Sequence, residues 1–595
     1  MDQQTKHHQY RMGLVGNCSY LAYIDDAASV KWLCWPRFDS SFIFGSLLDT
    51  KVGGQFSIAP TSSYKSKQYY VTNTNVLCTE FETAEGKFRV VDCAPRFFQY
   101  ERLFRPLMFI RKIELLSGSP VIKVVCNPSA DYGKKVPEKV PASNHIRFQG
   151  YDQQVRLTTD ISLANIMEEQ AFVLTHNQYL VLTYGEALEA PLKSTTEEFI
   201  TKTILYWETW IKSTYVPDIY QELVIRSALV LKLHQYEDTG GIIASGTTSL
   251  PEHNMSSRTW DYRYCWFRDS YYTLKAFNEL GHFDELEKYF EYIQNVLMRE
   301  TGRMQPLYTI TGGKDLEEFH IDLEGYLGNQ PVRIGNKAYM QIQNDVYGQV
   351  LVGLLPLFID KRLSFSGRSS YKILADRLLF WIEKTMDEPD AGLWEFRNVT
   401  QVHTYTLLFH WAGSKAVAKL GRNVGDKGLV ERAERLAKMA SDRVEQCYDP
   451  VRKVYTQAIG AEYLDASTLK LITMGYLDPN SEKAKLHLKA LEGLLKTDQG
   501  LFYRYVHQDD FGKPEATFLV CAFWYVDALA CVGRIDDAVK TLDNILSFAN
   551  HLNIFSEDVG LDGSQWGNYP QTYSHVGLIN AVFRISKKVD APGFK

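Results

Sequence analysis

The sequence lacks any long hydrophobic run, and its 595 residues carry a formal net charge of only -6. A membrane span needs about 20 consecutive, predominantly apolar residues, and no stretch of the chain offers them. The nearly balanced charge also gives no reason to expect a nucleic acid or a membrane surface as a partner. The opening residues, MDQQTKHHQYRMG, are polar and do not contain the apolar core of a signal peptide. We therefore expect a soluble, cytoplasmic protein.

Paired-cysteine spacings and the common catalytic motifs are also absent. The nine cysteines are an odd number, none is part of a CxxC arrangement, and several lie in apolar runs such as VIKVVC and FLVCAF. This pattern is typical of reduced, buried thiols and excludes an obvious disulfide framework. The sequence has no HExxH, GxSxG, P-loop or EF-hand loop, and its fourteen histidines show no metal-ligand spacing. No cofactor and no metal are therefore expected.

Aromatic residues, by contrast, are abundant and make up 13% of the chain. They gather with charged residues between Arg258 and Ala276, RTWDYRYCWFRDSYYTLKA, where a polar, aromatic loop runs into a helical pattern. Flat aromatic faces beside Arg and Asp side chains suit a ring-shaped ligand covered with hydroxyl groups. A buried ion pair among core aromatics explains any one pair better, but the whole cluster at a helix entrance favours a sugar-binding site.

Residues 1–190 are predicted to form an antiparallel β-sandwich. A chain of 595 residues is long enough for more than one domain. In its first part, short segments rich in β-branched and aromatic residues alternate with turn residues, which is typical of a sandwich. Strands are expected near Ser19–Ile24, Phe56–Ile58, Lys67–Val71, Val76–Glu82, Phe88–Cys93, Leu107–Leu115, Val121–Cys126, Ile146–Phe148, Gln154–Thr159, Gln170–Leu174 and Tyr179–Tyr184.

Residues 217–595 have helical spacing and are predicted to form a second, catalytic domain. Residues 191–216 are more polar and are expected to form a helical linker. From Pro217 onward, apolar residues recur every three or four positions up to the Gly240-Gly241 pair. Twelve helices are predicted, near 217–237, 268–281, 283–300, 338–358, 369–387, 404–420, 427–447, 465–474, 481–496, 517–532, 535–549 and 573–587.

The even number of predicted helices, joined by alternately short and long connections, is typical of an (α/α)6 barrel. A plain helical bundle and a solenoid are the alternatives, although the lack of a sequence repeat counts against a solenoid. Tight connections such as Gly281-His282 alternate with elaborated loops, so we expect a ligand site at the elaborated end of the domain. The long loops are 251–267, 301–335, 390–403, 498–516 and 551–572.

Two glutamates have settings that suit proton transfer. Glu395, in AGLWEFRN, lies between Trp394 and Phe396, and aromatic neighbours shield a carboxyl group from water, as a general acid requires. Glu557, in NIFSEDVG, is expected in a polar, glycine-rich loop, where a more solvated carboxylate would stay ionised and act as a general base on water. Inverting glycoside hydrolysis uses such a pair, held apart so that water fits between the two groups.

Several separate motifs give the chain a resemblance to a known family. They are GNCSYLAYIDDAASVKWLCWPRFDS, SGTTSLPE followed by RTWDYRYCWFRDS, EGYLGNQPVRIGN with QNDVYG, AGLWEFR with VHTYT, and SEDVGLDGSQWGNYPQTYSHVGLINA. On these residues, which occur in the family's order, the chain resembles the glucoamylase-like and trehalase-like enzymes of glycoside hydrolase family 15 over nearly its whole length. The resemblance implies an N-terminal β-sandwich, an (α/α)6 catalytic barrel, and inverting hydrolysis that releases β-D-glucose from the non-reducing end of an α-glucoside.

The resemblance also implies roles for particular residues. Glu395 looks like the general acid and Glu557 like the general base. Arg268 and Asp269 resemble the pair that holds the hydroxyl groups of the terminal glucose. Further walls or contacts of the substrate pocket are expected from Trp260, Asp261, Tyr262, Trp266 and Trp394.

Two departures from the family concern the outer part of the expected pocket. Phe396 stands where fungal relatives usually carry a second acidic residue, and SEDVGLDGSQWGN differs from the commoner SEEIDP-type pattern. The leaving-group preference therefore stays open. With no starch-binding module and no secretion signal, the expected partner is a short α-glucoside or oligosaccharide, with trehalose, maltose and isomaltose as candidates. The sequence does not fix the oligomeric state, and a homodimer remains one alternative.

Two other functions fit the same scaffold. An inverting disaccharide phosphorylase would use phosphate in place of water and would need no general base, so the presence of Glu557 in its motif counts against it. A non-catalytic sugar-binding relative would be expected to have lost one of the two carboxylates, whereas both are present. The sequence therefore favours an exo-acting, inverting α-glucoside hydrolase.

Overall fold

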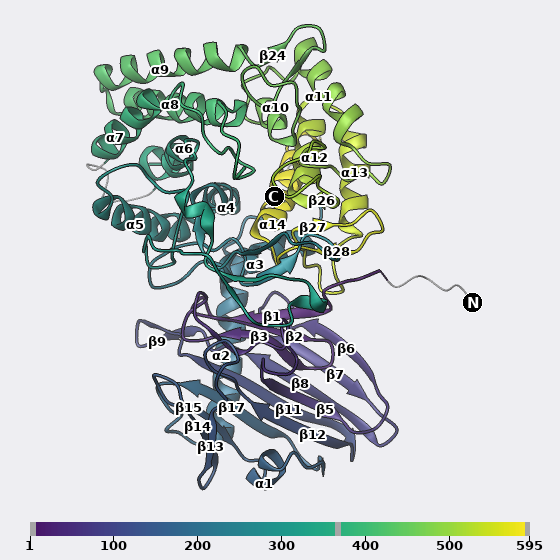
Figure 1. Ribbon diagram of the computed structural model, residues 1–595. Coiled ribbons are helices and arrows are strands. Elements are labelled where there is room, and N and C mark those ends of the chain that lie inside the picture. The colour runs from purple at the N-terminus through teal and green to yellow at the C-terminus, as the bar shows by residue number, and fades with distance from the viewer. Residues whose placement is uncertain (1–6, 363–370, 590–595) are drawn as a thin grey trace.

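The computed structural model describes residues 7–362 and 371–589 and consists of a sheet-rich domain followed by a helical domain (Figure 1). Two large antiparallel sheets build the first domain. The seven-stranded sheet contains β1 (Met12–Gly16), β2 (Leu21–Asp25), β3 (Ser29–Cys34), β4 (Phe42–Phe44), β5 (Gln55–Pro60), β12 (Val121–Asn127) and β16 (Phe172–Val173). The eight-stranded sheet contains β6 (Lys65–Tyr70), β7 (Leu77–Glu82), β8 (Gly86–Cys93), β11 (Met108–Gly118), β13 (Glu138–Pro141), β14 (His145–Gln149), β15 (Val155–Thr159) and β17 (Gln178–Tyr184).

Alternating side chains direct one face of these strands toward the interior. In β14, Ile146 and Phe148 are buried while Arg147 between them is exposed. The two sheets pack against each other, and Arg111 of β11 connects them. Its fully buried guanidinium pairs with Asp92 in its own sheet and donates to the carbonyls of Ala28 and Phe56 on the other side. Every strand predicted from the sequence overlaps an observed one.

The helical domain follows α2 (Leu192–Lys212), which packs on the eight-stranded sheet. Each of the twelve predicted helices has a counterpart among the described residues, although residues 369–370 of one prediction lie outside them. These helices are α3 (Gln221–Leu233), α4 (Phe267–Leu280), α5 (Phe283–Arg299), α6 (Val346–Ile359), α7 (Tyr371–Lys384), α8 (Thr404–Val424), α9 (Lys427–Glu445), α10 (Lys470–Thr473), α11 (Glu482–Leu495), α12 (Leu519–Cys531), α13 (Ile535–Leu546) and α14 (Thr572–Ser586).

Helix composition decides which helices lie inside. The sequence of α12, LVCAFWYVDALAC, is apolar apart from Asp527, and every one of its residues is buried. In contrast, α9 and α13 bury a single apolar stripe and lie at the periphery of the helical domain (Figure 1). The N-terminal ends of α4, α8, α12 and α14 each follow a long loop, so these loops gather at one end of the helical domain.

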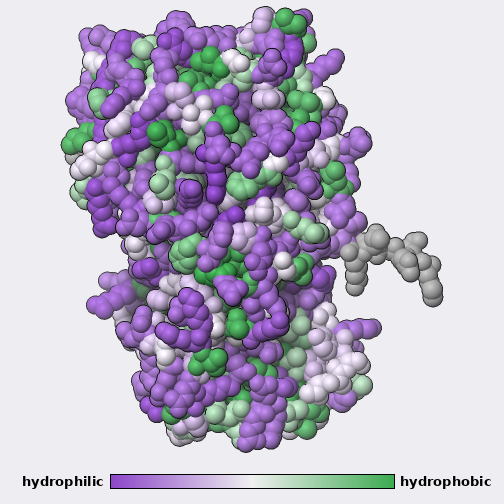
Figure 2. Space-filling model, in the orientation of Figure 1, coloured by the Kyte–Doolittle hydropathy of each residue, from purple (hydrophilic) through white to green (hydrophobic). Residues whose placement is uncertain are grey.

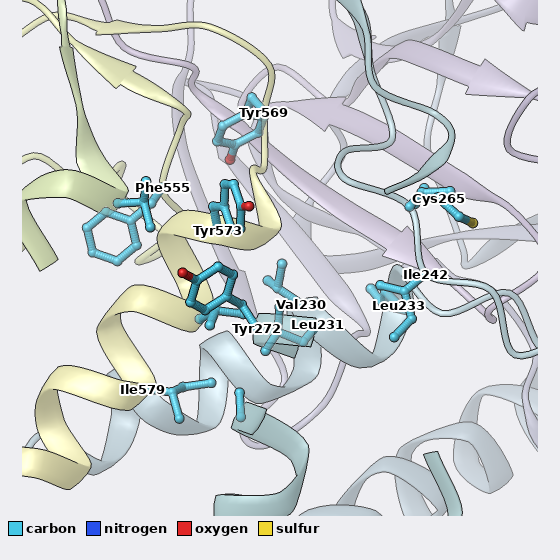
Figure 3. Close-up of a cluster of buried hydrophobic side chains, with 14 of the residues drawn as sticks. Val230, Leu231, Leu233, Ile242, Cys265, Tyr272, Phe555, Tyr569, Tyr573 and Ile579 are labelled. Atoms are coloured by element: carbon cyan, nitrogen blue, oxygen red, sulfur yellow. The ribbon is translucent and has the colours of Figure 1, made fainter. Parts of the chain in front are cut away.

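The two domains share one continuous apolar core. Part of it lies where α3, α4 and α14 meet, with Leu231, Tyr272 and Ile579 among the side chains (Figure 3). The Trp32 indole of β3 is buried at the junction and donates to Gly246 O in the helical domain, 2.9 Å away. The sheet-rich domain is therefore packed against the segment that leads into the aromatic cluster found in the sequence.

Surface and cysteine features agree with the composition. All nine cysteines are free and buried, as the sequence predicted. The face shown in Figure 2 is mainly hydrophilic, with apolar residues scattered over it. Among the helices that the described residues form, none combines the length and apolar character needed to cross a bilayer.

Candidate active site

A pocket lies at the end of the helical domain where the long loops gather. It encloses about 860 Å³ of space, part of it open to solvent. The loops ahead of α4, α8, α12 and α14 all contribute to its lining. Of the nine residues predicted for the site, eight line this pocket: Trp260, Tyr262, Trp266, Arg268, Asp269, Trp394, Glu395 and Glu557.

Glu395 is held on one wall by donors from two other segments. The Trp266 indole donates to Glu395 Oε1 at 2.7 Å, and the Arg268 guanidinium donates to the same oxygen at 2.9 Å. The backbone of Glu395 adopts a left-handed conformation (φ 60°), which is uncommon for a residue with a side chain. The Gln341 amide fixes this turn by donating to Glu395 O at 3.0 Å. About a quarter of the side chain remains exposed, and it faces the pocket.

Glu557 is buried on another wall, and the sequence-based expectation of a solvated carboxylate is corrected. Only 2% of the residue is exposed. It lies directly before β27 (Asp558–Val559), which pairs with β26 (Thr517–Phe518) and β28 (Gln565–Trp566) in a small sheet that the sequence did not reveal. Tyr262 OH donates to Oε1 at 2.7 Å, and Asn568 N donates to Oε2 at 3.0 Å.

The electrostatic setting of Glu557 follows from this burial. The pKa of Glu557 is raised from 4.5 to about 8. The largest cause is burial away from water, and the second is the negative charge of Glu252. The hydrogen bonds from Tyr262 and Asn568 and the charge of Arg504 act in the opposite direction. Glu557 therefore holds a proton more strongly than an ordinary glutamate does.

Two aromatic side chains connect the glutamates. Tyr262 follows β19 (Thr259–Asp261), and Trp266 ends β20 (Cys265–Trp266) just before α4. Their rings meet edge to face with centroids 5.5 Å apart. Since Tyr262 donates to Glu557 and Trp266 donates to Glu395, one short segment orients both carboxylates.

Arg268 and Asp269 occupy the first turn of α4 and line the pocket. Arg268 donates to Tyr573 OH at 3.0 Å and to Gln343 Oε1 at 2.6 Å, in addition to Glu395. Burial raises the pKa of Asp269 to about 7, although Arg268 opposes the shift. An acidic side chain in the first turn also faces the positive end of the helix dipole. The pair thus offers donors and acceptors on fixed backbone positions.

The remaining aromatic candidates line the pocket walls. The Trp394 indole donates to Asp465 Oδ2 at 2.8 Å, which fixes the ring. Two guanidinium groups lie over the Trp260 ring, with the Cζ atoms of Arg333 and Arg397 at 4.5 and 4.8 Å from its centroid. Both rings are half-buried and offer flat apolar surface to a ligand.

Asp261 lies elsewhere, and its predicted place in the site is corrected. It is fully buried and does not line the pocket. Both of its carboxylate oxygens accept hydrogen bonds from Arg263, at 2.9 and 2.8 Å. Arg263 in turn donates to Ser40 O of the sheet-rich domain at 2.8 Å. Alternate residues of this extended stretch face opposite sides, so Asp261 contributes to domain packing while Trp260 and Tyr262 face the pocket.

The sequence reasoning missed a charged cluster on the pocket wall next to Glu557. Arg504 donates to Glu252 Oε2 at 2.7 Å, and the Trp260 indole donates to Glu252 Oε1 at 3.3 Å. Arg258 pairs with Asp509 in the same region. The SGTTSLPE motif contributed to the family resemblance and 498–516 was predicted as a long loop, but no short-range pattern shows that their charges meet. Among the described residues, no group of three or more His, Cys, Asp or Glu side chains is arranged to hold a metal ion.

Comparisons with known proteins agree with this architecture. Residues 218–583 match the family model for glycosyl hydrolases family 15, and residues 3–176 match the model for the trehalase-like N-terminal domain. A trehalase of Thermoplasma acidophilum is 30% identical over 569 residues, covering 94% of this chain and 97% of the relative. A trehalase of Mycobacterium tuberculosis is 30% identical over 615 residues, covering 96% and 89%.

The solved structures include a similar fold. A bacterial glucoamylase complexed with acarbose superposes with a TM-score of 0.68 at 14% identity, covering 99% of this chain and 98% of the other. At this identity the likeness concerns the fold alone, a sheet-rich domain followed by a helical domain. Together with the family model, which spans more than half of the sequence, these matches establish that the chain belongs to glycosyl hydrolases family 15 and is a glycoside hydrolase.

Proposed function

We propose that the protein is an inverting, exo-acting α-glucosidase whose preferred substrate is trehalose and whose first product is β-D-glucose. The observation that carries the proposal is the meeting of Glu395 and Glu557 in one pocket, each oriented by the Tyr262–Trp266 pair. The two 30% identical trehalases, each aligned over nearly its whole length, favour trehalose among the short α-glucosides. The proposal includes closure of the helical domain into an (α/α)6 barrel with the pocket at one end.

Glu395 acts as the general acid in this mechanism. It protonates the glycosidic oxygen as the bond to the anomeric carbon breaks. Its Oε1 accepts from the Arg268 guanidinium. When Arg268 turns its donors to sugar hydroxyls, Trp266 and Gln343 remain as the donors to Glu395 Oε1, and the carboxyl group carries the proton.

Glu557 acts as the general base. It must be ionised to take a proton from the attacking water, which approaches the anomeric carbon from the face opposite the leaving group. Tyr262 OH and Asn568 N hold one carboxylate oxygen each, so the group keeps a single orientation. Its burial excludes bulk water and strengthens its interaction with the attacking water.

The product anomers test this proposal directly. Inverting hydrolysis of α,α-trehalose should yield equal initial amounts of β-glucose, from the attacked ring, and α-glucose, from the leaving ring. Proton NMR of reactions on trehalose, maltose, isomaltose and maltoheptaose, each with and without phosphate, reports both the anomers and the preferred linkage. Initial α-glucose alone from trehalose would overturn the role of Glu557 as base. A strict requirement for phosphate would point to a phosphorylase.

The pH dependence should also reveal Glu557. We expect the rising limb of the kcat/KM profile to extend to about pH 8, because a base works only when ionised and the pKa of Glu557 is about 8. The general acid must be protonated, so its loss of a proton sets a separate, falling limb. Glu252→Gln removes the negative charge that helps to hold the proton on Glu557 and leaves the positive charge of Arg504 in place. The rise should therefore move to lower pH in this variant.

A matched control separates this effect from general loss of charge. Glu114→Gln removes a carboxylate that pairs with Arg89 and Lys112 on the sheet-rich domain. Its pH profile should coincide with that of the unmodified enzyme. If Glu252→Gln also left the rising limb in place, Glu252 would not control the protonation of Glu557.

A further inference from the structure

The segment that leads into the first strand of the sheet-rich domain lies against the loop that backs Glu557. His8 O accepts from Gln565 N at 2.8 Å, and Tyr10 N donates to Gln565 Oε1 at 3.1 Å. The phenol of Tyr10 donates to Gly567 O at 2.9 Å. Figure 1 places β1 on the side of the sheet-rich domain nearest to β27 and β28. Two stretches more than 500 residues apart in sequence are thus joined by hydrogen bonds.

Gly567 is the point at which this contact reaches the carboxylate. A Cβ atom at Gly567 would lie 2.6 Å from Glu557 Cβ and 2.7 Å from Glu557 Oε2, so the bare backbone of Gly567 packs directly against the Glu557 side chain. The next amide, Asn568 N, donates to that same Oε2. A shift of the Gly567–Asn568 peptide would therefore move the acceptor oxygens of Glu557.

A second set of contacts fixes the position of the amino-terminal segment itself. The Asn550 amide donates to Tyr10 O at 2.8 Å and to Met12 O at 3.0 Å, and Tyr569 OH donates to Met12 O at 2.6 Å. The His8 ring stacks on Trp566 of β28 with centroids 4.2 Å apart. Tyr10 is 1% exposed, so no solvent replaces its hydrogen bond to Gly567.

We propose that Tyr10 is a positioning residue for the reaction: through Gly567 it sets the placement of Glu557, and the sheet-rich domain is thereby part of the catalytic apparatus. This inference rests on the role proposed for Glu557. Tyr10 does not line the pocket and so contributes nothing to sugar binding itself. Loss of its hydroxyl group should change the chemical step and leave substrate affinity unchanged.

Tyr10→Phe in the full chain tests this. A displacement of about 1 Å at a catalytic group can cost about 10²-fold in rate, and a relaxed loop should cost less. We expect kcat on trehalose to fall roughly 10-fold with KM nearly unchanged, and the rising limb of the pH profile to shift as the setting of Glu557 changes. His8→Ala, at a partly exposed position, should lower kcat and shift the rising limb of the pH profile in the same direction as Tyr10→Phe, each by a smaller amount.

The control variant is Tyr151→Phe, which removes a partly buried phenol that donates to Ser129 O at 2.7 Å within the sheet-rich domain. It should leave kcat, KM and the pH profile unchanged. Unchanged kcat in Tyr10→Phe, or a rise in KM that accounts for the whole change in kcat/KM, would overturn the inference. Full activity of Glu557→Gln would overturn the proposed function itself, which keeps the two failures distinguishable.

Discussion

Glu557→Gln should lower kcat on trehalose by about 10³-fold while the protein stays folded. The change removes the only group that we assign to accept the proton of the attacking water. Glutamine keeps the shape of the side chain, and its carbonyl oxygen still accepts from Tyr262 OH. Since Arg268 and Asp269 are untouched, KM should change little. Steady-state kinetics with purified variants measures both quantities.

The same substitution should raise stability at alkaline pH. The pKa of Glu557 is raised from 4.5 to about 8 by folding, so the folded protein holds this proton more tightly than the unfolded chain. The resulting stabilisation is present below pH 4.5 and is lost as pH rises toward 8, where the carboxylate must ionise in a buried site. Glutamine does not ionise. The melting temperature of Glu557→Gln should thus exceed that of the unmodified enzyme at about pH 8 by more than at about pH 5.

Glu492→Gln provides a matched control for both effects. Glu492 also accepts from a tyrosine, Tyr525 OH at 2.6 Å, but lies outside the pocket. Its substitution should leave kcat at the unmodified value. If Glu557→Gln kept substantial turnover while Glu492→Gln had the kcat of the unmodified enzyme, Glu557 would not be the base. If Glu557→Gln differed from the unmodified enzyme in melting temperature by the same amount at both pH values, the raised pKa of the buried Glu557 would be contradicted.

Helix and strand positions could be predicted well because they depend on local periodicity. One helix boundary shows where this stops. A helix was predicted from residue 338, but α6 begins at Val346, and the residues between form a short 3-10 turn and an irregular stretch. In that stretch Gln341 fixes the backbone of Glu395 and Gln343 accepts from Arg268. Contacts with the site override the helical pattern there.

The site was predicted where its residues are close together in sequence and missed where they are not. The stretch from Trp260 to Asp269 contains its own aromatic and charged pattern, and most of it lines the pocket. Glu252 and Arg504 lie 252 residues apart, so nothing local indicates that they pair. The burial of Glu557 likewise depends on Gly567 and on a small sheet between distant segments. Only the fold brings these groups together.

Glu395→Gln should have an effect that depends on the leaving group. On trehalose, whose leaving oxygen needs a proton, kcat should fall about 10³-fold. On α-D-glucosyl fluoride, fluoride departs without protonation, so the loss should be less than about 10-fold. The carbonyl oxygen of the introduced glutamine would still accept from the Trp266 indole and the Arg268 guanidinium, which preserves the pocket wall. Initial rates on the two substrates measure the contrast.

The comparison of the two substrates shows which carboxylate is the acid and which is the base, because the base is needed with either leaving group. Water must lose its proton whether it displaces fluoride or a sugar, so Glu557→Gln should be slow on both substrates. A variant of the acid regains activity on the fluoride, and a variant of the base does not. If Glu557→Gln were the one rescued by α-D-glucosyl fluoride, the roles would be reversed. The proton that Glu557 holds up to about pH 8 would then be the one given to the leaving sugar.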